Sequence, residues 1–164
     1  MKKALFLPFI FILILGACVA QPPKKTQLEI REIQTRSYNT QDVKLVMKAV
    51  MHTLQDDNFI IKQANVDLGL LTAQKEVDLS SGGFSTFLGS GSSERRYRNN
   101  AITEASANIS EFGDQTRVRI NFQQKVLDNK GVSMSIKQIQ DASFYQNFFS
   151  QVDKSVFLGK ENLQ

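Results

Sequence analysis

The chain has 164 residues, of which 41% are hydrophobic and 22% are charged. These proportions indicate one compact domain and argue against a disordered or fibrous chain. The formal net charge is +4, and the only cysteine is Cys18, which excludes an intramolecular disulfide. The core must therefore be stabilised by packing alone, which about 150 residues can achieve.

The N-terminal residues have the pattern of an export signal. A lysine pair at residues 2 and 3 precedes an uncharged apolar run over residues 4–15, which is shorter than the roughly 20 residues that span a bilayer. The run leads into Leu15-Gly16-Ala17-Cys18, which resembles the lipobox of bacterial lipoproteins in every position. The resemblance implies cleavage before Cys18, a diacylglyceryl group on its thiol and a further acyl chain on the new amino group.

Such an anchor would hold the protein on a membrane without spanning it, because two or more acyl chains bind stably at about 0.8 kcal/mol per buried CH₂. We expect residues 1–17 to be a lipoprotein signal peptide and residues 18–26 a short tether that contains Pro22 and Pro23. In lipoproteins of this kind an aspartate after the lipidated cysteine favours the inner membrane. Val19 stands there, so the resemblance implies the periplasmic side of the outer membrane, with the inner membrane as the less favoured alternative.

Export also bears on the partners of the protein. Removal of Lys2 and Lys3 with the signal lowers the basic count from 20 to 18 against 16 acidic residues, a net charge of +2. Because export separates the chain from cytosolic nucleic acid, we expect no nucleic-acid partner. The expected partners are the membrane, through lipidated Cys18, and a protein of the cell envelope.

Hydrophobic periodicity predicts the elements of the domain at residues 27–164. Residues 27–36 are rich in β-branched residues and are predicted as a strand with a possible bulge. Residues 41–56 are predicted as a helix, because Val43, Val46, Met47, Val50 and Leu54 share one face. Leu45, Ala49 and His52 fall on the opposite side of that helix, which is predicted to be mainly solvated.

The rest of the domain is predicted to be strands followed by a second helix. Strands are expected at residues 59–63, 68–74, 101–112, 116–126 and 132–139. The last three are expected to form an antiparallel meander with one wet face, to which residues such as Arg117 and Arg119 belong. Asp141 is the expected cap of the helix, whose buried stripe contains Tyr145, Phe148, Phe149, Val152 and Val156.

This order predicts an α+β fold: an antiparallel sheet of about five or six strands with two helices packed on one face, in the order strand, helix, strands, helix. The topology resembles the helix-grip domains of envelope lipoproteins, including the lipoprotein C subunit of the β-barrel assembly machinery. Residues 33–36, 54–59, 68–76 and 144–149 look like those of an uncharacterised family of Gram-negative outer-membrane lipoproteins, a resemblance that implies no activity.

A long Gly/Ser-rich connection at residues 78–100 separates two of the predicted strands, where hairpin loops commonly have 2–5 residues. It carries apolar residues and then arginines that could bind a partner: Phe84, Phe87, Leu88, Arg95, Arg96 and Arg98. One interpretation is a docking finger that inserts its apolar tip into a partner or the lipid interface. The other is a flexible linker whose phenylalanines fold back on the core, and the sequence favours neither.

The sequence offers no set of residues for catalysis. Gly89-Ser90-Gly91 lacks the lysine and the following helix of a phosphate-binding loop. His52 is the only histidine, so neither a structural zinc site nor a Ser-His pair is predicted. We therefore expect no enzyme, no metal and no cofactor.

Two hypotheses follow for the function. The favoured one is a non-enzymatic accessory or binding subunit of an envelope assembly or transport complex, which would bind through the long loop and the exposed sheet face. The alternative is a lipoprotein that encloses a lipid or another small hydrophobic ligand between the sheet and the C-terminal helix.

Overall fold

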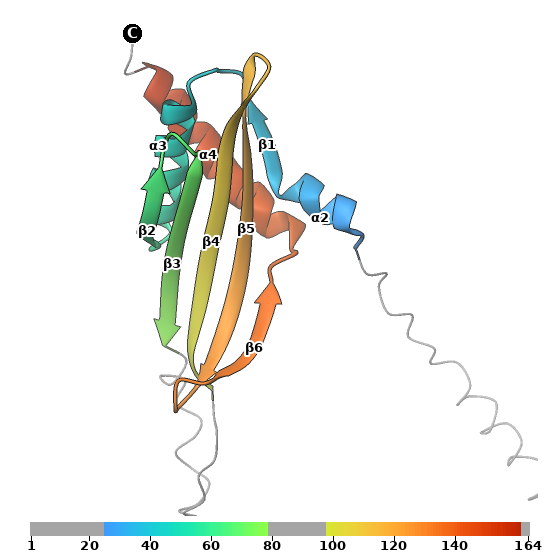
Figure 1. Ribbon diagram of the computed structural model, residues 1–164, viewed down its shortest axis with the longest axis vertical. Coiled ribbons are helices and arrows are strands. Elements are labelled where there is room, and N and C mark those ends of the chain that lie inside the picture. Colours follow the sequence, from blue (N-terminus) through green and yellow to red (C-terminus); the bar gives the residue numbers. More distant parts are fainter. Residues whose placement is uncertain (1–24, 79–97, 162–164) are drawn as a thin grey trace, which may run out of the picture.

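The computed structural model describes residues 25–78 and 98–161 and has an α+β fold. Its elements in chain order are α2 (Gln27–Ile33), β1 (Thr35–Tyr38), α3 (Val43–Asp56), β2 (Ile60–Asn65), β3 (Leu70–Asp78), β4 (Arg98–Phe112), β5 (Gln115–Asp128), β6 (Ser133–Gln138) and α4 (Ala142–Glu161). The six strands form one antiparallel sheet, as predicted, and α3 and α4 pack on one side of it (Figure 1).

The strands follow the order β1-β5-β4-β3-β2, and β6 also pairs with β5. One edge of β5 is therefore shared by two short strands. β1 pairs with residues 116–119 of β5, and β6 pairs with residues 123–127. Between the two strands, the Ile120 amide donates to Gln34 O and the Ile139 amide donates to Phe122 O, at 3.0 and 2.9 Å.

The prediction of one strand over residues 27–36 is wrong. Residues 27–33 form α2, and the strand begins only at Thr35. The helix starts with a reciprocal capping box: the Thr26 hydroxyl accepts from the Glu29 amide at 3.3 Å, and the Glu29 carboxylate accepts from the Thr26 amide at 2.6 Å. This cap and the burial of Ile30 outweigh the strand propensity of the segment. The chain thus has three described helices, and a helix precedes β1.

The predicted helix at residues 41–56 is confirmed as α3. Asp42 caps it by accepting from the Leu45 amide at 2.8 Å, and Asn58 ends it with a φ of +63°. Its predicted apolar face is buried, except that Val43 is half-buried, and His52 is exposed as predicted. Ala49 was placed on the solvated side, but it is buried because α4 packs along that side of α3.

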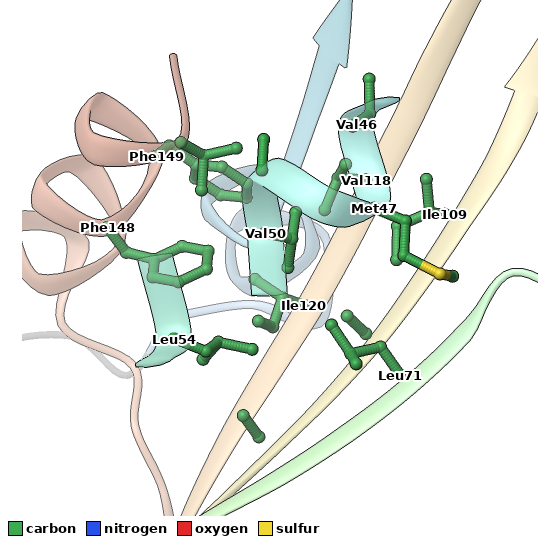
Figure 2. Packing of buried hydrophobic residues seen from close by; sticks show 14 of the residues in the cluster. Val46, Met47, Val50, Leu54, Leu71, Ile109, Val118, Ile120, Phe148 and Phe149 are labelled. Atoms are coloured by element: carbon green, nitrogen blue, oxygen red, sulfur yellow. The ribbon is translucent and has the colours of Figure 1, made fainter. Parts of the chain in front are cut away.

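The core lies between the sheet and the helix pair. All five residues of the predicted α4 stripe are buried, and Figure 2 shows Phe148 and Phe149 beside Val50 and Leu54 of α3. Phe122 of β5 makes edge-to-face contacts with four rings, those of Phe59, Phe144, Tyr145 and Phe148. These contacts connect the middle of the sheet to α4.

Candidate functional site

Most of the residues predicted from the sequence as sites lie outside the described residues. Cys18 and five residues of the long loop belong to this group: Phe84, Phe87, Leu88, Arg95 and Arg96. Arg98 is the first residue of β4 and is opposite Asp128 in the register of the sheet. Asp78 pairs with Asn100, so the two strands extend into both ends of the predicted loop.

The sheet has one face away from α3 and α4, which we call the outer face (Figure 1). Its polar side chains come from four neighbouring strands: Thr35 and Ser37 of β1, Arg117, Arg119, Asn121 and Gln123 of β5, Ser106, Asn108 and Ser110 of β4, and Thr72 and Gln74 of β3. Arg119, Ser106, Asn108 and Ser110 are exposed. Within the described residues no helix covers this face.

Charged groups on the outer face differ in their partners. Lys125 and Glu104 form an ion pair at 2.7 Å. The Arg117 guanidinium lies over the Phe112 ring, 3.3 Å from its centroid, and Phe112 remains 55% exposed at the end of β4. Neither Arg117 nor Arg119 has an ion-pair partner among the described residues. Within the part of the chain that the structure describes, this region of the outer face therefore carries uncompensated positive charge.

Sequence reasoning placed Arg117 and Arg119 on the wet face but did not single them out as a site. The alternation along β5 was the available signal for their exposure. The absence of a counter-charge depends on residues of β1 and β4 that are distant in the sequence. Only the strand register brings those residues next to the arginines.

A second candidate surface is the groove between α3 and α4. Two cavities of about 370 and 440 Å³ lie along it, and His52 and Ser155 line both of them. Gly159 lets α4 approach α3 closely, because a Cβ there would be 2.7 Å from Leu45 Cδ1. No hydrogen bond joins His52 to Ser155 in the described structure, and His52 is exposed. The groove therefore lacks the oriented base and nucleophile of a covalent catalyst.

A polar cluster lies where β1 and β6 meet on the edge of β5. The Tyr145 hydroxyl accepts from Gln34 Nε2 and from the Phe122 amide, at 3.2 and 3.3 Å, and donates to Ile139 O at 3.1 Å. Burial raises the pKa of Tyr145, and the hydrogen bonds from Phe122 and Gln34 oppose this effect. Because every contact is internal, the cluster stabilises the sheet edge and presents no site to a ligand.

The described residues contain no group of three or more His, Cys, Asp or Glu side chains arranged to hold a metal ion. In the same residues, no helix is long and apolar enough to cross a membrane.

No protein-family model matches the chain, and no curated protein matches it in sequence. A function for the chain is therefore inferred from the sequence motif at residues 15–18 and from the geometry of the outer face.

Proposed function

We propose that the protein is a lipid-anchored lipoprotein on the periplasmic side of the outer membrane, and that it serves as a non-enzymatic binding subunit of an envelope assembly or transport complex. The observation that carries the anchor is the motif Leu15-Gly16-Ala17-Cys18 directly after a basic pair and an apolar run. The thiol of Cys18 is the group that would carry the lipid.

The outer face of the sheet supports a binding role. It is wide, polar and uncovered by the described helices, and it contains arginine and an exposed aromatic ring, two residue types that are enriched at protein interfaces. The predicted docking finger, with Phe84, Phe87 and Leu88, would be a second contact for the same partner. Loops of this kind often carry function on a rigid scaffold.

The packing between the sheet and α4 favours this proposal over the hydrophobic-ligand alternative. Phe122 contacts the rings of both Tyr145 and Phe148 in the space where such a ligand would lie. All three are buried. A ligand there would have to displace aromatic side chains from a densely packed core.

Labelling with radioactive palmitate in a Gram-negative host tests the anchor. Cys18→Ser should abolish incorporation of the label and leave the chain unprocessed, because a serine hydroxyl cannot form the thioether. Val19→Ser is the matched control, since it introduces the same side chain one residue later and keeps the thiol. Label on the Cys18→Ser chain would overturn the lipoprotein assignment.

A further inference from the structure

Among the described residues, the strand neighbours of two arginines on the outer face include no acidic side chain. In the register of the sheet Arg119 lies between Asn108 and Thr35, and Arg117 lies between Ser110 and Ser37. All four neighbours carry hydroxyl or amide groups. Their side chains share the face of the arginines, because directly paired residues of antiparallel strands lie on the same side.

The two carboxylates at the β4–β5 hairpin do not neutralise these arginines. Glu111 alternates with Ser110 and Phe112 along β4 and so belongs to the other face. Asp114, in the turn, accepts a hydrogen bond from Gln41 at 3.2 Å. Neither carboxylate forms an ion pair with Arg117 or Arg119.

Three other strand cations of the described chain are engaged internally, whereas Lys62 and Lys137 are exposed. Arg36 forms an ion pair with Asp153 at 2.7 Å. Lys125 is paired with Glu104 at the same distance, and Lys75 donates to Asp57 O at 2.9 Å. Against these, Arg117 contacts only a ring, and Arg119 makes no hydrogen bond or ion pair within the described residues.

The contact with the Phe112 ring orients the Arg117 guanidinium so that its N–H groups could bind an external anion. A guanidinium that lies over an aromatic ring uses its flat face for that contact, and its in-plane N–H groups are left to donate. Because the ring contact already restricts the Arg117 side chain, binding an anion would cost less conformational entropy. Phe112 therefore serves as a support for Arg117 as well as an exposed apolar contact.

We propose that Arg117, Arg119 and Phe112, which we call the arginine patch, dock an acidic segment of a protein partner. The spacing favours an extended peptide: residues 117 and 119 are two positions apart on one strand, about 7 Å, and alternate carboxylates of an extended peptide have the same spacing. Bidentate pairing with carboxylates is the mode that arginine favours. This inference rests on the proposed function, because it names the partner chemistry of the outer face.

The test measures binding of a rhodamine-labelled peptide of alternating glutamate and threonine to the purified full chain, by fluorescence anisotropy at about 50 mM salt, where surface charges are weakly screened. The double variant Arg117→Gln, Arg119→Gln should bind about tenfold more weakly, because it loses two charge-assisted contacts. The matched control is Lys44→Gln, Lys48→Gln, which removes the same charge from two exposed residues of α3 on the other side of the sheet. The control should keep the wild-type affinity.

Three results would overturn the proposal. Equal weakening in both double variants would show a response to net charge alone, and unchanged binding in the arginine variant would show that the patch is not used. Tighter binding of glycerophosphoglycerol than of the peptide, lost in the arginine variant, would instead assign the patch to an anionic lipid surface. Palmitate labelling of the wild-type chain separates this test from that of the anchor: a labelled wild-type chain that binds no peptide would refute the patch alone.

Discussion

Along β5, neighbouring residues belong to faces with opposite roles. Val118, Ile120 and Phe122 are 0% exposed and lie in the core, whereas Arg117 and Arg119 lie on the outer face and have no counter-charge among the described residues. One strand therefore contributes both to the stability of the domain and to the surface that we assign to binding. Because the outer face adds little to stability, its residues can change with the partner while the fold is retained.

The largest expected change in the free energy of unfolding comes from a substitution on the core face, at Phe122. Phe122→Ala should lower the free energy of unfolding by about 3–5 kcal/mol, because it removes a buried ring and leaves a cavity among four aromatic neighbours. Urea denaturation of the full chain, followed by circular dichroism, measures the loss. Arg119→Gln is the control on the outer face and should stay within about 0.5 kcal/mol of the wild type. Similar losses in the two variants would refute the contrast between the faces.

The core side also contains a polar group whose removal should be destabilising. Tyr145→Phe keeps the ring but removes the hydroxyl that accepts from the Phe122 amide and donates to Ile139 O. We expect a loss of about 1–3 kcal/mol, because buried backbone groups would be left without partners. The same denaturation assay measures it, and hydrogen exchange at Phe122 should accelerate. A wild-type stability for Tyr145→Phe would show that water replaces the hydroxyl at the junction of β1 and β6.

The elements with long regular patterns could be predicted from the sequence. The stripes of α3 and α4 extend over several turns, and the alternation in β5 assigns its residues to the correct faces, because each pattern is local. The segment before β1 was mispredicted because Ile30 and Ile33 fit a short helix as well as an irregular strand. The capping box of Thr26 and Glu29 was the signal that could have decided between them.

The candidate site was less accessible to sequence reasoning than the fold. The exposure of Arg117 and Arg119 follows from alternation alone. Their lack of a counter-charge among the residues that the structure describes follows from the pairing of β5 with β1 and β4. This pairing sets residues about 80 positions apart beside each other in the case of Arg117 and Ser37. The support from Phe112 likewise depends on the geometry of the β4–β5 hairpin.

The smallest effect is expected at a second buried tyrosine of the core side, Tyr38 of β1. Its hydroxyl is buried and has no partner in hydrogen-bonding geometry within the described residues, although the Asp153 carboxylate lies close enough to raise its pKa, whereas the Tyr145 hydroxyl is hydrogen-bonded. Tyr38→Phe should therefore change the free energy of unfolding by less than about 0.5 kcal/mol near neutral pH, since no partner is left behind. A loss as large as that of Tyr145→Phe would show that the Tyr38 hydroxyl is hydrogen-bonded in solution.

At alkaline pH, ionisation of Tyr38 should contribute to the pH dependence of the free energy of unfolding. Burial, and then the negative charge of Asp153, raises the pKa of Tyr38 above the ordinary value of 10.0. The unfolded chain therefore releases this proton at a lower pH than the native chain, and the stability that is complete below about pH 10 is lost as the pH rises toward the native pKa. Urea midpoints at about pH 8 and about pH 11 should differ less for Tyr38→Phe than for the wild type. The pH dependence of the midpoint that remains in Tyr38→Phe should come partly from Tyr145, because burial also raises the pKa of that residue. The same pH dependence in the wild type and in Tyr38→Phe would show that the Tyr38 hydroxyl is solvated.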